Sequence, residues 1–370
     1  TISWQKTLGG TGTEYSGNII ETSGGGFMIA GRSNSDDGDV TGGHGSMDAW
    51  LVKLTSTGTI DWQKTYGGSG EEGATFIKET SDGGFFFSGY TTSTDGDLTS
   101  NQGGYDYWGV KVSSTGVLDW QKNLGGTSED IAYTMDETAN GDFILSGSAL
   151  SSNGDITNAK GNYDFWIVKL SASGVLLDEG SFGGDNDDDA RAIKATSDGG
   201  FLIAGRTSTF ENGDVTGQNG SQDFWLAKIK ADFTLDWQVC LGGSNADYAN
   251  AISILNDGTE ILLAGASNSA NGDVTTNYGA SDYWVVKLSD PSVGVNELSN
   301  AISFYPNPTT NNLTIESLST IESIAIFDIK GALVQTETSN HFSVKDLQQG
   351  VYIIHVKTIN GVFTKRLIKE

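Results

Sequence analysis

The chain has 370 residues and a formal net charge of −26, which argues against a nucleic acid partner because the phosphates would be repelled. Aromatic residues make up 10% of the chain, too many for a disordered acidic protein. No apolar run approaches the roughly 20 residues of a membrane-spanning helix, and we expect no signal peptide at residue 1. Cys240 is the only cysteine, which excludes an intramolecular disulfide.

The first 289 residues contain one pattern five times, at a spacing of roughly 58 residues. Its first marker is an aspartate two residues before a tryptophan; the tryptophans are Trp50, Trp108, Trp166, Trp225 and Trp284. A Gly-Asp pair followed by an aliphatic residue and a Gly-Gly pair recur in the same register. Three markers in one register over five copies indicate a true internal repeat.

Each copy reads as four short strands separated by tight turns. In the second copy we predict strands at 73–80, 85–92, 107–112 and 117–123, with a glycine-containing turn after the first and the third. No useful length of residues 1–290 shows helical periodicity. Four antiparallel strands in a unit of this size are typical of one blade of a β-propeller.

The two ends of the repeat region predict how it closes. Residues 2–6 (ISWQK) match residues 60–64 (IDWQK), the last strand of the first copy, whereas the fifth copy stops after Leu288 without this strand. We therefore predict an all-β fold in which a five-bladed β-propeller, residues 1–289, is closed by the N-terminal strand. Closure would remove exposed sheet edges. The alternative is an open solenoid, which needs capping repeats that the sequence does not show.

The C-terminal part differs from the repeats in composition and pattern. All three prolines lie beyond residue 290, and acidic and basic side chains are nearly balanced there. We predict a linker at 290–300, and then a small Ig-like β-sandwich at 301–370, built from short alternating strands with turns such as Asn360-Gly361.

Four motifs of this tail resemble the type A sorting domain of type IX secretion, a family of Bacteroidota-type bacteria. The residues that carry the resemblance are Tyr305, Pro306, Asn307, Pro308, Asp328, Gly331, Gly350, Tyr352, Lys365 and Arg366. The resemblance implies export to the outer-membrane surface or the medium, with the type IX translocon and its outer-membrane shuttle protein as partners of residues 301–370. An ordinary Ig-like module that packs or binds sugar is the alternative.

The loops at one face of the predicted propeller are rich in acidic residues. Two aspartates of each copy are candidate Ca²⁺ ligands, because Ca²⁺ prefers several oxygens at once; they are Asp39, Asp48, Asp97, Asp106, Asp155, Asp164, Asp214, Asp223, Asp273 and Asp282. None of these stretches follows the EF-hand pattern. The alternative is structural, since every copy needs the same turn and aspartate can accept backbone N–H groups there.

We expect no enzyme activity, because the repeats offer no set of catalytic histidine with serine or cysteine. A glycosidase-like propeller, which would use carboxylates at the central channel, is one alternative, and a structural spacer is another. We expect the channel to be lined by one position of each first strand, namely Gly17, Thr75, Tyr133, Arg191 and Asn250. Asp189 is expected as a further contribution to the channel. Loop tyrosines are further candidates for ligand contact: Tyr105, Tyr163 and Tyr278. The sequence thus favours a secreted or surface-exposed, non-catalytic propeller for adhesion or binding of surface glycans.

Overall fold

The computed structural model describes residues 1–255, 260–289, 302–317, 320–328, 332–358 and 361–370. These residues are strands, turns and loops, and contain no helix. Within them, therefore, no helix could cross a membrane. The chain divides into two compact units, with the main boundary between Lys287 and Leu288. The predicted linker at 290–300 lies outside the described residues.

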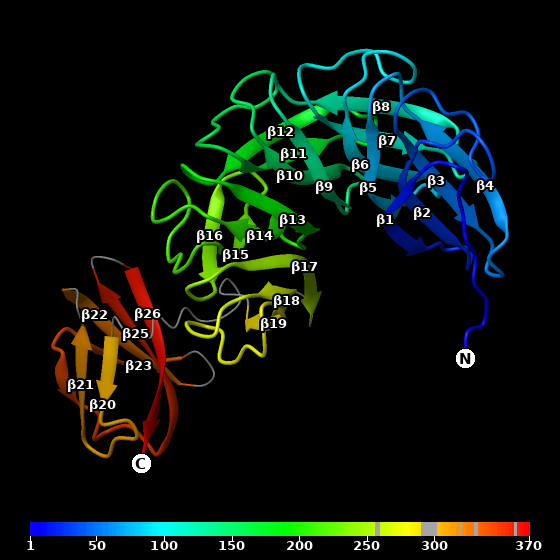
Figure 1. The fold of residues 1–370 in the computed structure, drawn as a ribbon. Helices are drawn as coiled ribbons and strands as arrows, with labels where there is room; N and C mark the ends of the chain where they lie inside the picture. The colour runs from blue at the N-terminus through cyan, green and yellow to red at the C-terminus, as the bar shows by residue number, and fades with distance from the viewer. Residues whose placement is uncertain (256–259, 290–301, 318–319, 329–331, 359–360) are drawn as a thin grey trace. The chain divides into compact units, whose positions relative to one another are not determined.

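The first unit consists of antiparallel sheets that follow one another along the chain, each with its strands paired in sequence order (Figure 1). Four of them have four strands and the last has three. Their strands are β1 (Glu14–Glu21), β2 (Phe27–Ser33), β3 (Asp48–Leu54), β4 (Ile60–Tyr66); β5 (Glu72–Glu79), β6 (Phe85–Thr91), β7 (Asp106–Val112), β8 (Leu118–Leu124); β9 (Asp130–Glu137), β10 (Phe143–Ala149), β11 (Asp164–Leu170), β12 (Leu176–Phe182); β13 (Asp188–Ala195), β14 (Phe201–Thr207), β15 (Asp223–Ile229), β16 (Leu235–Leu241); and β17 (Asp247–Leu255), β18 (Glu260–Ser267), β19 (Asp282–Ser289).

The predicted strands of the second copy are confirmed to within one residue at each end. The turn between β5 and β6 is closed by hydrogen bonds from Thr80 N to Gly84 O and from Gly83 N to Thr80 O, both 2.9 Å. Gly83 has a φ of 82°, which a residue with a Cβ adopts only with strain. The glycines of the repeat therefore fix where each hairpin turns.

Aromatic side chains join one sheet to the next. Tyr107 of β7 packs against Trp166 of β11 at a ring-centroid distance of 4.5 Å, and Phe165 packs against Trp225 at 4.4 Å. All four of these side chains are fully buried. Burial of each large aromatic ring stabilises the fold by about 1.5–3 kcal/mol. The repeated tryptophans from Trp50 to Trp225 are therefore core residues.

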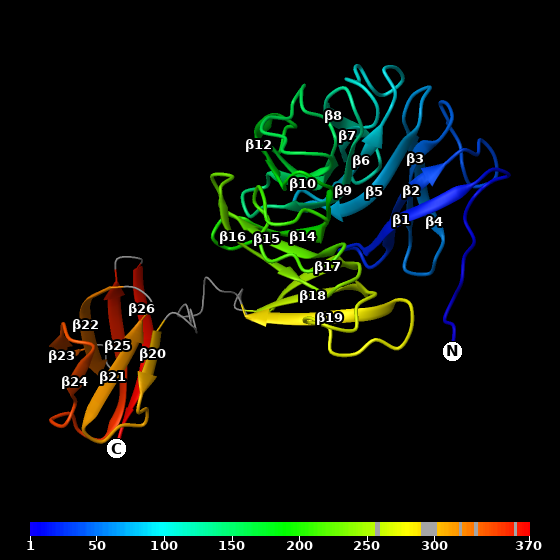
Figure 2. The same cartoon turned by 60° about the vertical axis from the view of Figure 1, so that its left-hand side comes forward.

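The predicted closure of the ring is not confirmed, because the described residues of the first unit form no closed sheet. Residues 2–6 form no strand, and the last sheet has the order β17-β18-β19 without a fourth strand from the N-terminus (Figure 2). The first and last sheets consequently expose side chains that intermediate sheets bury. Tyr283 is 98% exposed, whereas its equivalent Phe224 is fully buried against Trp284.

The second unit is a β-sandwich of two antiparallel sheets that share one core. The core contains Leu313 and Ile315 from one sheet and Ile324, Ile354 and Val356 from the other. One sheet has the order β20-β21-β24 and the other β23-β22-β25-β26. The strands are β20 (Ile302–Tyr305), β21 (Asn312–Ser317), β22 (Ile321–Asp328), β23 (Leu333–Glu337), β24 (His341–Ser343), β25 (Gly350–Thr358) and β26 (Gly361–Lys369).

Candidate functional site

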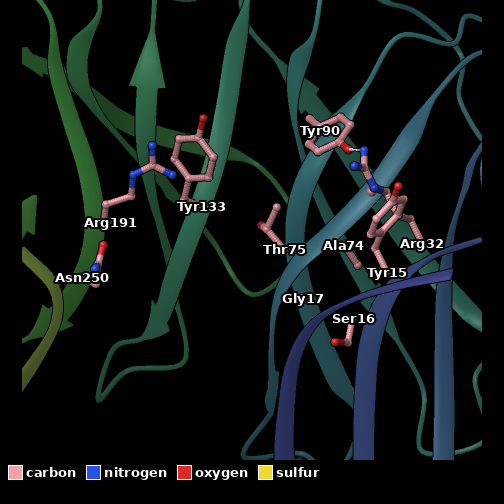
Figure 3. Close-up of a pocket in the computed structure, with 11 residues that line it drawn as sticks. Tyr15, Ser16, Gly17, Arg32, Ala74, Thr75, Tyr90, Tyr133, Arg191 and Asn250 are labelled. Atoms are coloured by element: carbon pink, nitrogen blue, oxygen red, sulfur yellow. Dashed lines mark hydrogen bonds between the residues drawn. The ribbon is translucent and has the colours of Figure 1, made fainter. Parts of the chain in front are cut away.

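The first strands of all five sheets meet at one pocket with a volume of about 380 Å³ (Figure 3). The lining residues come from β1, β5, β9, β13 and β17, together with two residues from the second strands β2 and β6. This volume lies within the range of about 300–1,000 Å³ that is usual for small-ligand sites. The pocket is lined by Tyr15, Ser16, Gly17, Arg32, Gly73, Ala74, Thr75, Tyr90, Tyr133, Arg191 and Asn250.

One wall of the pocket is built around Arg32 of β2. Its guanidinium carbon lies 4.8 Å from the centroid of the Tyr15 ring and 5.8 Å from that of Tyr90. Arg32 Nη1 donates to Glu71 Oε1 at 2.8 Å and also donates to the Tyr90 hydroxyl. Tyr90 in turn packs edge-on against Tyr105 at 5.1 Å. Ion pairing and ring packing thus hold Arg32 in one orientation.

Across the pocket, the second wall is built around Arg191 of β13 (Figure 3). Its guanidinium carbon lies 4.0 Å from the centroid of the Tyr133 ring, which comes from β9 of the preceding sheet. Burial raises the pKa of the Tyr133 hydroxyl, so this phenol is neutral and able to donate at physiological pH. The wall therefore consists of a guanidinium stacked over one face of an aromatic ring.

A buried carboxylate stands behind the second wall. Asp189 Oδ2 accepts a hydrogen bond from Arg206 Nε at 2.6 Å, and Arg206 Nη2 also pairs with it. Asp189 Oδ1 accepts from Ser148 Oγ at 2.6 Å. Arg191 Nη2 lies 4.0 Å from Asp189 Oδ2. Asp189 is therefore engaged by Arg206 and Ser148 and does not itself line the pocket.

The five first-strand positions predicted for the channel all line this pocket. The prediction missed Arg32 and Tyr90, which reach the pocket from the second strands, and Tyr15, two residues before Gly17. A signal for them was present in the sequence. The positions equivalent to Arg32 and Tyr90 in the other sheets hold Ser148, Arg206 and Ala266, so this position varies between copies although its neighbours repeat.

The aspartates of the Gly-Asp pairs act as backbone acceptors. The first glycine of each Gly-Gly pair donates its N–H to the carboxylate, at 3.4 Å for Asp39 and 3.1 Å for Asp97. The same bond is 3.2 Å at Asp155 and 3.1 Å at both Asp214 and Asp273. These contacts tie the long loop of each sheet to the chain that enters the sheet, as the structural alternative expected.

The aspartates before the tryptophans lie at the junctions between consecutive sheets. Each accepts a backbone N–H four residues earlier in the chain, for example from Gln102 to Asp106 Oδ2 at 2.6 Å. The other oxygen is buried without a hydrogen-bond partner at four of the five positions, namely Asp48, Asp106, Asp164 and Asp223. Burial raises the pKa of Asp106, Asp164 and Asp223 to about 6.

A second acid from the next sheet stands beside each of these oxygens. Burial raises the pKa of Asp188, the neighbour of Asp164, to about 7. Such carboxyls could share a proton or hold a cation, but no group of three or more His, Cys, Asp or Glu side chains in the described part of the chain is arranged to hold a metal. The Ca²⁺ assignment therefore stays a prediction.

The three loop tyrosines named from the sequence lie in different environments. Tyr105 and Tyr163 donate their hydroxyls to Glu71 and Glu129, at 3.1 and 2.8 Å. Tyr278 is 89% exposed, and its backbone N–H is bonded to Asp282 Oδ2 at 2.5 Å. None of the three lines the pocket, although Tyr105 supports Tyr90, which does.

Within the second unit, motifs far apart in the sequence meet at one end of the sandwich. Asn307 Oδ1 accepts the N–H of Ile368 at 2.8 Å, and Thr309 N donates to Ile368 O at 2.9 Å. Gly350 is paired with Lys369, and Asp328 with Tyr352. Gly331 lies outside the described residues, and Lys365 and Arg366 lie in β26. The fold thus brings residues of these motifs together through one side-chain hydrogen bond and several backbone pairings.

Comparison with known protein families finds a match in the C-terminal unit. Residues 303–370 match the model of the secretion system C-terminal sorting domain. This match supports a type IX sorting tail, which implies a secreted or cell-surface protein that interacts with the type IX secretion machinery. No curated protein matches the chain.

Similarity to solved structures is distant. The chain is similar to a protein of unknown function from Bacteroides caccae, with 9% identity and a TM-score of 0.43 over 78% of this chain and 86% of that one. It is also similar to a puromycin hydrolase mutant, with 11% identity and a TM-score of 0.41 over 93% and 42% of the two chains. A third similar structure is a β-fructofuranosidase mutant of Bombyx mori, with 14% identity and a TM-score of 0.31 over 94% of this chain and 84% of that one. Likeness at this level identifies no function.

Proposed function

We propose that residues 1–289 are an exported, non-catalytic propeller that binds a saccharide of a cell surface or matrix in its axial pocket. The observation that carries this proposal is the pocket lining, which combines three tyrosines with two arginines. Aromatic rings offer flat apolar faces with a polar hydroxyl at one end, and arginine offers several fixed donors. A sugar ring presents both an apolar C–H face and many hydroxyl acceptors, so it suits this combination.

Binding is favoured over hydrolysis by the distribution of carboxylates. Glycoside hydrolysis uses two carboxyl groups on either side of the scissile bond, about 5–9.5 Å apart. The residues that line the pocket include no aspartate or glutamate, and nearby Asp189 is engaged by Arg206 and Ser148. This arrangement supports the glycosidase alternative poorly.

The sorting domain supplies the delivery half of the proposal. In this scheme residues 301–370 are recognised by the type IX translocon and its shuttle protein at the outer membrane, and the propeller is released or displayed outside the cell. A chain that ends at Ser289 should remain inside a host that has this secretion system. Efficient export of that shortened chain would contradict the sorting role.

The binding half is tested with the full chain on a glycan array. Tyr133→Ala removes a pocket ring, whereas Tyr278→Ala removes an exposed loop tyrosine outside the pocket. We expect the wild type and Tyr278→Ala to retain the same glycans, and Tyr133→Ala to lose them while its thermal melt shows that it is still folded at the assay temperature. Unchanged glycan binding by Tyr133→Ala would show that the glycan binds outside this pocket. Absence of any glycan ligand would favour the spacer alternative.

We also propose that the five sheets close into a ring, with residues 2–6 as the outer strand of the last sheet. Convergence of five first strands on one pocket supports this arrangement. The pairing of β3 with β4 places Val52 opposite Gln63, so the equivalent pair in the closed ring is Val286 and Gln5. A disulfide between Gln5→Cys and Val286→Cys should form readily. No cross-link in this variant, with one forming between Val52→Cys and Gln63→Cys, would contradict closure.

A further inference from the structure

The arginines of the chain are concentrated at the pocket. The sequence has only four, and three of them lie at this site: Arg32 and Arg191 line it, and Arg206 stands behind Arg191. The chain as a whole has 47 acidic and 21 basic side chains, yet the pocket lining has two cationic residues and no acidic one. The pocket is therefore a locally cationic site in an acidic protein.

The positive charge at the pocket is not fully neutralised. Arg32 is paired with Glu71 at 2.8 Å. On the other wall, one carboxylate faces two guanidinium groups, because Asp189 is bonded to Arg206 at 2.6 Å and lies 4.0 Å from Arg191. Asp189 can offset only one of these two charges. The excess positive charge lies on Arg191, whose side chain is 34% exposed.

Comparison among the five copies shows that Arg191 is not a requirement of the sheet. The residue just before it is small in every copy, namely Ser16, Ala74, Ala132, Ala190 and Ala249. The lining position itself holds Gly17, Thr75, Tyr133, Arg191 and Asn250. A residue that each sheet needed for packing would repeat, as the neighbouring small residue does. The different residues at this position therefore make the pocket asymmetric, because the aromatic ring comes from β9 and the guanidinium from β13.

We propose that the pocket selects a saccharide that carries a carboxylate or sulfate group, with the oxyanion on Arg191 and the sugar ring beside the Arg191–Tyr133 pair. This inference rests on the proposed saccharide-binding function and adds the charge of the ligand. A guanidinium matches the oxygens of a carboxylate or sulfate with two parallel N–H donors. Partial burial of Arg191 beside Tyr133 limits screening of this contact by solvent.

The test uses the full chain and an array of matched glycans. Each uronate oligosaccharide is paired with its methyl ester, and each sulfated one with its desulfated form. We expect binding to one acidic series at least about tenfold tighter than to its neutral partner, since a charge-assisted hydrogen bond is worth about this much. Which series binds distinguishes carboxylate from sulfate. High salt should weaken the binding.

Two variants connect the selectivity to the pocket. Arg191→Gln should remove the preference for the acidic member of each pair, whereas Lys194→Gln, an equal charge change on the same strand outside the pocket, should preserve it. Equal binding of acidic and neutral partners by the wild type would overturn the charge selectivity and leave saccharide binding intact. Retained preference in Arg191→Gln would overturn the role of Arg191. Binding to no glycan at all would overturn the proposed function itself.

Discussion

The guanidinium carbon of Arg191 lies 4.0 Å from the centroid of the Tyr133 ring, although the two residues belong to different sheets. They occupy the same position of consecutive copies, the fourth residue of the first strand. Neighbouring sheets therefore form one wall of the pocket from a single repeated position. An architecture that is symmetric in its strands can in this way present an asymmetric site.

Closure of the ring predicts an unusual sensitivity of an exposed residue. Phe165→Ala should destabilise the first unit by about 3–5 kcal/mol, because Phe165 is fully buried against Trp225. Tyr283 is its equivalent in the last sheet and is 98% exposed in the open arrangement. If residues 2–6 complete that sheet and it packs on β3, Tyr283→Ala should cost a similar amount in urea denaturation. A cost near zero would indicate that the ring stays open.

The buried carboxyls at the sheet junctions predict how stability depends on pH. Burial raises the pKa of Asp106 to about 6 and that of Asp188 to about 7, from an unperturbed value of 3.8. Such groups bind protons more tightly in the folded state than in the unfolded state. Their protonation therefore stabilises the fold at low pH, and this contribution is lost as the pH rises from about 4 to 7. The melting temperature should therefore fall between pH 5 and pH 8.

Below about pH 4, further acidification should lower the melting temperature, because carboxylates with a lowered pKa become protonated. A hydrogen bond from Thr80 lowers the pKa of Asp82 to about 2, so the stabilising contribution of Asp82 is lost only as the pH falls from 3.8 toward 2.

Millimolar Ca²⁺ at pH 8 tests the predicted cation sites in the same melting experiment. A rise in melting temperature with Ca²⁺, reversed by chelator, would support the predicted cation sites. A melting temperature that is constant from pH 5 to pH 8 would contradict the buried carboxyl argument.

The Gly-Gly pairs should not tolerate a side chain at their first position. A Cβ at Gly67 would lie 2.4 Å from Asp48 Oδ1 and 2.5 Å from Glu72 Oε2. We expect Gly67→Ala to destabilise the first unit by about 1–3 kcal/mol, as overpacking of a buried junction does. The control is Gly24→Ala, where a Cβ would meet nothing within 4 Å. Equal melting temperatures for the two variants would show that the junction can relax.

The contact between the first and last sorting motifs predicts a defect in export. Asn307→Ala removes the acceptor for the Ile368 N–H, a bond worth about 1 kcal/mol. Export by a host with type IX secretion should fall, whereas glycan binding by the purified chain should be unchanged. Thr336→Ala, on an exposed position of β23, is the matched control. Equal export of both variants would show that this contact is dispensable.

The sequence by itself determined most of the local structure of this protein. Alternating apolar residues and turn glycines located the strands of the second copy to within a residue, because both signals act over a few neighbouring positions. Repetition also identified pocket positions such as Tyr133 and Arg191, since equivalent residues of equivalent strands line the same pocket. The sorting motifs were readable for the same reason, as short segments of fixed order.

Only the tertiary structure decided which distant groups meet. The pairing of Arg32 with Glu71 and of Asp189 with Arg206 depends on how strands and sheets pack, which sequence spacing does not encode. The same packing leaves one oxygen of Asp48 buried beside Glu72 and raises the pKa of Asp48. The burial of a side chain and the charge around it depend on neighbours from several strands. These neighbours come together only when the chain has folded.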